Sequence, residues 1–255
     1  MIFRMKGKKI EENTPELLYN QNEPDSPIDN SLISVIERYH DDHQQKECRS
    51  YKLLGIFLDE HLTLDAHSNH IVSKLSRSLY CIKQAKHIIP AHGLKSLYFA
   101  LIHSHLTYCS LIMHGTTAKN RNKIIKIQKK AIRIMTNSKY NAHTNPLYIE
   151  HGILPYDLLI KQSQLLFMHS IAYEYAPTSF TGIWIKNADR DPNLHLRNAN
   201  DYYLVQPRTE TFKKSTMYAL PFSWNELAPE IKLQHNRVTF KWALRAHLLE
   251  TLNQP

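Results

Sequence analysis

The chain has 255 residues, of which 42% are hydrophobic, and only six glycines, which argues against glycine-rich phosphate-binding loops and a turn-dense β-sandwich. Its three cysteines have no paired spacing, so we expect neither a zinc knuckle nor a disulfide framework. We therefore expect an intracellular location, either nuclear or cytoplasmic. The formal net charge of +9 favours an anionic partner, and no apolar run approaches the roughly 20 residues that a membrane span needs.

The first sixty residues alternate between apolar and acidic stretches. Residues 1–10 are typical of a short strand, and residues 11–30 hold six acids, no base and three prolines, which predicts a solvated loop. Residues 31–38 fit a strand or a short helix. The apolar run Tyr51–Leu58 with its central Gly55 predicts a buried strand or a tight hairpin.

Helical periodicity dominates the centre of the chain. Apolar residues at steps of three and four predict helices at about 65–89, 92–106, 118–136, 155–175 and 238–252. Residues 137–146 are predicted as a loop, residues 202–205 and 215–220 as two short strands, and Trp224 as part of a packed corner. We therefore expect a mainly α fold with small β elements and a small α+β C-terminal region. The expected domains are residues 1–60, 61–177 and 178–255.

The predicted helix 118–136 carries two faces of different character. Ile124, Ile127, Ala131 and Ile134 recur at helical steps, which predicts one apolar face. Basic residues recur at the same steps on another face, and no acid interrupts them, although like charges at this spacing repel one another. Residues 61–140 together contain 13 Lys and Arg against one acid, Asp65. Such a block favours a phosphate backbone. The predicted nucleic-acid contacts are Lys74, Arg77, Lys119, Lys123, Lys126, Lys130 and Arg133.

Two patterns in the chain could suggest a metal site. Residues 39–42 read Y-H-D-D, which matches the Y-x-D-D turn of reverse transcriptases, but the polar residues that follow do not form an apolar strand. We interpret this match as a coincidence. His67 and His70 lie one helical turn apart and fit a polar helix surface better than a metal site, which needs at least three converging ligands. We assign no catalytic residue, no metal ligand, no cofactor and no small-molecule substrate.

Several stretches of the sequence form a specific pattern when their order and spacing are considered together. The first begins at Tyr51 and reads Y-K-L-L-G-I-F-L-D-E-H-L-T. Further along come I-I-P-A-H-G-L-K-S-L-Y-F-A-L-I-H-S-H-L-T-Y-C, K-I-Q-K-K-A-I-R-I-M-T-N and H-T-N-P-L-Y, and then Arg208, Lys214-Ser215, Pro221 and W-N-E-L-A-P-E-I at 224–231. With residues 1–6, this set resembles the C-terminal part of non-LTR retrotransposon reverse transcriptases of the LINE, jockey-like type.

The resemblance implies a primer-grip hairpin followed by a helical thumb and a trailing region. The implied primer-grip residues are Tyr51, Leu54, Gly55 and Asp59, and the implied partner is an RNA or DNA template–primer. The family's catalytic Y/F-A-D-D turn and its three metal-binding aspartates have no counterpart here, and His114 stands where the family commonly has tryptophan. We therefore expect this chain not to polymerise nucleic acid alone, with Mg²⁺ expected only for the complete polymerase. The alternative hypothesis is a basic helical protein-interaction module.

Overall fold

The computed structural model describes residues 50–190 and 197–253. These residues are mainly helical, with one two-stranded antiparallel sheet, which confirms the predicted class of mainly α with small β elements. The predictions made for residues 1–49, including the acidic loop and the tetrad at 39–42, lie outside the described residues.

A β-hairpin opens the described part of the chain. Strands β1 (Ser50–Leu53) and β2 (Ile56–Asp59) pair antiparallel, with Leu53 opposite Ile56. The two turn residues, Leu54 and Gly55, have φ angles of 47° and 83°. Positive φ at both positions is the pattern of a type I′ turn, which suits the twist of a two-residue hairpin. The predicted hairpin is confirmed, but it is buried on β2 only, where Ile56 joins the core, and β1 is exposed from Tyr51 to Leu53.

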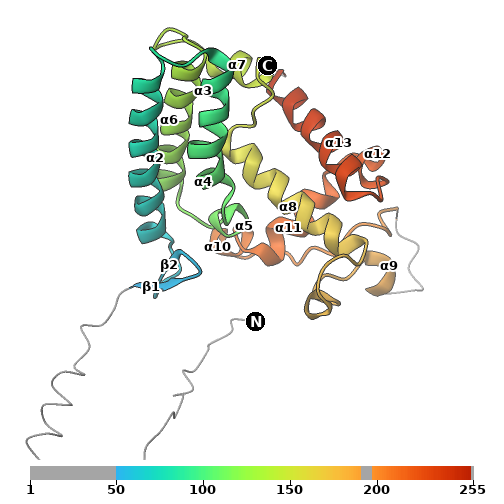
Figure 1. Ribbon diagram of the computed structural model, residues 1–255. Helices are drawn as coiled ribbons and strands as arrows, with labels where there is room; N and C mark the ends of the chain where they lie inside the picture. The colour runs from blue at the N-terminus through green and yellow to red at the C-terminus, as the bar shows by residue number, and fades with distance from the viewer. Residues whose placement is uncertain (1–49, 191–196, 254–255) are drawn as a thin grey trace, which may run out of the picture. The chain divides into compact units, whose positions relative to one another are not determined.

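A bundle of helices follows the hairpin (Figure 1). Its elements are α2 (Asp65–Ala85), α3 (Ala91–Tyr98), the π-helical turn η1 (Phe99–His103), α4 (Ser104–Thr107), α5 (Ser110–Met113), α6 (Ala118–Met135) and α7 (Thr144–Glu150). The continuous run from α3 to α4 matches the helix predicted at 92–106. The loop predicted for residues 137–146 is wrong at its end, because α7 already begins at Thr144. Pro146 is tolerated there since first-turn amides have no intrahelical acceptor.

The remainder of the described chain is also helical. Its elements are α8 (Tyr156–Ala172), η2 (Thr178–Phe180), α9 (Asn187–Arg190), α10 (Glu210–Lys213), α11 (Thr216–Asn225), α12 (Pro229–Lys232), α13 (Arg237–Glu250) and η3 (Thr251–Asn253). The strands predicted at 202–205 and 215–220 are wrong. Tyr202 forms an isolated bridge with Lys186, and Ser215 precedes the first residue of α11. Within the described residues, the regular elements of the predicted α+β region are therefore helices, joined by turns and irregular segments, apart from that bridge.

Helix α11 continues through a proline, Pro221. Pro221 has no amide proton and cannot donate to the carbonyl of Met217, four residues earlier. The indole Nε1 of Trp184 donates to that Met217 carbonyl at 3.3 Å instead. A side chain from outside the helix thus supplies the hydrogen bond that the proline removes.

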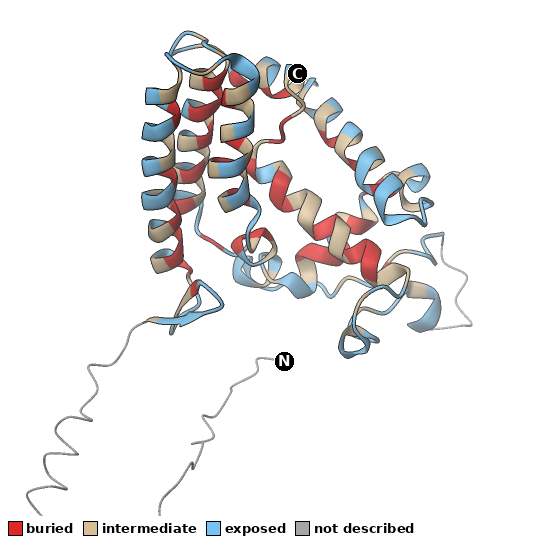
Figure 2. Cartoon of the chain, in the orientation of Figure 1, coloured by how far each residue is buried: buried red, intermediate tan, exposed pale blue. Residues whose placement is uncertain are grey.

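The core lies along the facing sides of the long helices (Figure 2). In the bundle, Leu75 and Ile82 of α2, Ile102 of η1, and Ile124 and Ile132 of α6 are fully buried. The same buried cluster continues through α8 and α11 to α13. The predicted domain boundaries at residues 60 and 177 stay predictions.

One buried polar side chain joins three parts of this core. The Gln128 Nε2 atom on α6 donates to Tyr98 Oη at 3.1 Å and to the Leu154 carbonyl at 3.0 Å. Its Oε1 atom accepts from the Tyr156 amide at 2.8 Å. Burial raises the pKa of the Tyr98 hydroxyl to about 12, so this phenol stays protonated at neutral pH. Gln128 therefore ties α6 to α3 and to the start of α8.

Candidate nucleic-acid interface

Helices α2 and α6 lie side by side and run in the same direction (Figure 1). At their N-terminal ends, Asn120 Nδ2 donates to Asp65 Oδ1 at 2.5 Å, and Ser68 Oγ lies 3.0 Å from Thr116 Oγ1. One turn further along both helices, Lys123 Nζ donates to Asn69 Oδ1 at 3.1 Å. The exposed flanks of the two helices therefore form one surface, which we call the α2–α6 surface.

Four lysines form a row along the exposed flank of α6. They are Lys119, Lys123, Lys126 and Lys130, of which Lys123 is half-buried and the others are exposed. Thr117 caps the helix, accepting from the Asn120 amide at 3.4 Å. The opposite flank faces the core. Of the predicted apolar face, Ile124 and Ala131 are buried and Ile127 and Ile134 are half-buried, whereas the buried polar Asn120 and Gln128 were missed.

The charge of this surface is opposed by a single acid of block 61–140, Asp65, which is hydrogen-bonded to Asn120. Among the described residues, the only Lys or Arg of block 61–140 that forms an ion pair is Arg121, whose Nε lies 3.7 Å from Asp157 Oδ1. Cations in the first turn of a helix are also unfavourable, because the helix dipole is positive there. Lys119 occupies such a position on α6. The arrangement therefore costs free energy in the isolated protein and leaves a field that attracts anions.

Arg133 is partly committed to the fold. Its Nε atom donates to the Ala142 carbonyl at 2.9 Å, which fastens the segment after α6 back onto the helix. This bond restricts the movement of the guanidinium. The lysines of the α6 row are therefore more available than Arg133 for contact with an anion.

The other two predicted contacts, Lys74 and Arg77, lie on a different flank of α2. Loss of solvent lowers the pKa of the His70 imidazole, and the positive charges of Lys74, Lys52 and Arg77 lower it further. His70 itself packs against Phe57 of the hairpin, with ring centroids 4.9 Å apart. Lys74 and Arg77 thus lie on α2 within electrostatic reach of His70 and are not part of the α6 row.

A groove follows the α2–α6 surface toward the C-terminal ends of both helices. It has a volume of about 450 Å³ and is lined by Ser76, Leu79, Tyr80, Lys83, Lys86, Lys130, Arg133, Ile134, Ser138 and Tyr140. Sequence reasoning missed Tyr80, Lys83, Lys86 and Tyr140. Tyr80 and Lys83 follow Ser76 at steps of four and three, which puts them on one flank of α2. The sequence alone does not tell which flank of α2 lies beside α6.

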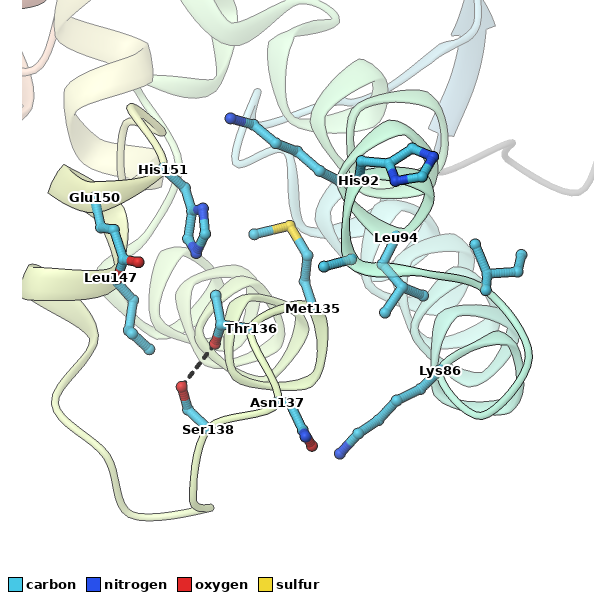
Figure 3. Close-up of a pocket in the computed structure, with 13 residues that line it drawn as sticks. Lys86, His92, Leu94, Met135, Thr136, Asn137, Ser138, Leu147, Glu150 and His151 are labelled. Carbon is cyan, nitrogen blue, oxygen red and sulfur yellow. Dashed lines mark hydrogen bonds between the residues drawn. The ribbon is translucent and has the colours of Figure 1, made fainter.

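A second cavity, of about 550 Å³, adjoins this groove at the end of the bundle (Figure 3). It lies between the start of α3, the end of α6 and α7, and Met135 and Leu94 form part of its apolar wall. Lys86 and Ser138 line both cavities. Thr136 Oγ1 and Ser138 Oγ are hydrogen-bonded at 2.7 Å on one side of the opening, and Lys86 and Asn137 extend toward each other (Figure 3).

The primer-grip-like residues form a braced hairpin. Tyr51 and Leu54 are exposed, and the Tyr108 hydroxyl donates to the Leu54 carbonyl. The Asp59 carboxylate accepts from the Thr63 amide at 2.7 Å and from the Thr63 hydroxyl at 2.9 Å. Loss of solvent raises the pKa of this carboxyl, but hydrogen bonds from Thr63 and from the amides of Asp65 and Leu64 together outweigh that effect and lower it overall. Asp59 therefore shapes the turn that leads from the hairpin into α2.

The two histidines considered as metal ligands have different surroundings. His67 is buried, and neither ring nitrogen has a hydrogen-bond partner among the described residues, while His70 packs against Phe57. Burial lowers the pKa of His67, and His70 lowers it further, so the neutral ring is favoured. No group of three or more His, Cys, Asp or Glu suited to a metal occurs within residues 50–190 and 197–253.

Comparisons with protein-family models, with curated proteins and with solved structures found no match to this chain. None of the described helices combines the length and the hydropathy of a transmembrane span.

Proposed function

We propose that the α2–α6 surface binds the phosphate backbone of RNA or DNA, in the manner of the thumb of the non-LTR reverse transcriptases that the sequence resembles. The observation that carries the proposal is the uninterrupted row of four lysines on the exposed flank of α6, with no acid on that helix. Phosphates along a strand offer a matching row of negative charge, and each contact releases a condensed counterion.

The order of the elements supports the thumb interpretation. The braced hairpin passes directly into α2 through the Asp59–Thr63 turn, so a grip would lie next to a helical phosphate-binding surface. Tyr51, Leu54, Gly55 and Asp59 would form that grip. The chain would contribute contact with a template–primer and not the chemistry, because two-metal phosphoryl transfer requires positioned carboxylates and Mg²⁺ of the complete polymerase.

Contacts of this kind position a strand without reading its bases. Binding should therefore be nearly independent of sequence and steeply dependent on salt. Four phosphate contacts on a duplex predict a slope of log K against log salt of about −3.6, since each contributes about 0.9.

The experiment replaces Lys123, Lys126 and Lys130 together by glutamine and measures duplex affinity by fluorescence anisotropy at several salt concentrations. We expect the slope to become shallower by roughly 2–3 units. The fold should persist, because these side chains lie off the buried face of α6.

The control removes the same charge elsewhere, through Lys186→Gln, Lys214→Gln and Lys241→Gln, all at exposed positions outside α2 and α6. This variant should retain most of the wild-type slope. Equal losses in both triple variants would show diffuse attraction by net charge and would contradict the proposal. Binding without salt dependence would instead favour the protein-interaction module.

A further inference from the structure

We propose that the groove between α2 and α6 takes an unpaired nucleic-acid strand, whose bases stack on Tyr80 and Tyr140. This inference rests on the proposed function and specifies the form of nucleic acid that the surface receives. It concerns side chains beyond the lysine row, which by itself would accept any phosphate backbone.

The first argument is the exposure of the two aromatic rings. Tyr80 is 63% exposed and Tyr140 is 82% exposed, although both line the groove. A tyrosine that served only the core would bury its ring, as Tyr98 and Tyr148 do in this protein. Rings left open beside cations form the combination with which single strands are bound, because every base offers an aromatic face.

The second argument is the charge around the rings. Lys83, Lys86, Lys130 and Arg133 line the same groove, and no acid occurs among its described lining residues. These cations come from both α2 and α6, so they flank the groove from two sides. A strand that lay between them would have its phosphates neutralised while its bases reached the tyrosines. A duplex would present its phosphates but would hide its base faces.

The third argument is the continuity of the groove with the second cavity. Lys86 and Ser138 line both spaces, so a strand in the groove can continue around the end of the bundle. That cavity offers the apolar surface of Met135 and Leu94 together with the hydroxyls of Thr136 and Ser138 (Figure 3). Such a mixed lining suits a base, which has an apolar face and polar edges.

The test compares three probes at one salt concentration: a 12-nucleotide oligo(dT), an abasic strand of equal length and a hairpin duplex. The wild-type protein should bind oligo(dT) at least about tenfold more tightly than the abasic strand, since stacking is lost without bases. Tyr80→Leu combined with Tyr140→Leu should reduce oligo(dT) affinity to that of the abasic strand. Duplex affinity should change less than about twofold, because the phosphate contacts remain.

Two further variants serve as controls. Tyr80→Phe with Tyr140→Phe keeps the aromatic faces and should retain the preference for oligo(dT). Tyr175→Leu with Tyr203→Leu removes two exposed tyrosines outside the groove and should leave all three affinities unchanged. Thermal melting of each variant establishes that it is folded.

Two results would overturn the inference while leaving the proposed function intact. One is equal affinity of the wild-type protein for oligo(dT) and the abasic strand, and the other is unchanged oligo(dT) affinity in the double leucine variant. If a poly-glutamate peptide competed as well as oligo(dT), the groove would be assigned to an acidic protein partner. Absence of wild-type binding to all three probes would overturn the proposed function itself.

Discussion

Gly55 allows the hairpin turn to lie close to Tyr108. Its φ angle is 83°, and a Cβ atom at this position would lie 3.4 Å from the Tyr108 hydroxyl oxygen. Gly55→Val would place a branched side chain in a backbone conformation that it rarely adopts, next to a hydroxyl that already donates to Leu54. We expect the free energy of unfolding to fall by about 1–3 kcal/mol, measured by urea denaturation.

Gly115→Val provides the matched control. Gly115 also lies in a turn, but its φ is in the ordinary range, and the nearest atom to an added Cβ is the Ile112 carbonyl oxygen at 3.8 Å. This substitution should cost clearly less than Gly55→Val. Equal destabilisation by the two variants would contradict the role assigned to the hairpin turn.

Residues differ in how much of their role the sequence reveals. Gly55 could be recognised because a glycine inside an apolar run indicates a turn or a close backbone approach. Gln128 could not, because a polar residue within a basic helix is expected to face solvent. Its burial depends on the Leu154 carbonyl and the Tyr156 amide, which the chain brings to α6 only after it folds.

Among the elements, α11 depends on a hydrogen bond from outside the helix. Trp184 donates to the Met217 carbonyl that Pro221 leaves without a helical donor. Trp184→Phe should lower the free energy of unfolding, since it removes this bond and also alters the ring contact with Phe167. In a Pro221→Ala background the new alanine amide can donate to Met217, so the same substitution should cost less.

A double-mutant cycle isolates this effect from the ring contact. The four proteins (wild type, the two single variants and the double variant) are compared by chemical denaturation, and the coupling energy should be about 0.5–1 kcal/mol. Additive effects of the two substitutions would show that the Trp184 indole does not replace the missing helical bond.

The long helices were predictable because their apolar residues recur at helical spacing over many turns, as in α2, α6 and α13. The short run at 215–220 was not, because a few apolar residues fit a strand or a buried helix equally well. Helix α11 is stabilised by Trp184, which lies 33 residues before its partner Met217. The sequence around α11 does not reveal that contact.

The candidate site also has one part that the sequence predicts and one part that it does not. The lysine row could be predicted from α6 alone, because it needs only the period of one helix. The groove could not, because it depends on how α2 and α6 are rotated against each other. Lys74 and Arg77 were predicted as phosphate contacts on a different helix, and they lie on α2 near enough to His70 for their charges to lower the pKa of its ring.

For the whole molecule, the unbalanced charge of block 61–140 links stability to ionic strength. In the free protein, folding brings the α6 lysines together, and their repulsion opposes the folded state. Added salt screens repulsion between exposed charges, so the melting temperature of the free protein should rise between about 50 and 200 mM salt.

With saturating nucleic acid, the effect of salt on the melting temperature should reverse. A ligand that binds only the folded protein raises its melting temperature in proportion to the logarithm of affinity, and salt weakens that affinity steeply. The melting temperature of the complex should therefore fall over the same salt range, as differential scanning fluorimetry can measure. The Lys123, Lys126 and Lys130 glutamine variant should flatten both trends. Parallel salt trends with and without nucleic acid would contradict this linkage. The lysine row would thus make the protein least stable at low salt when alone, and most stable there when bound.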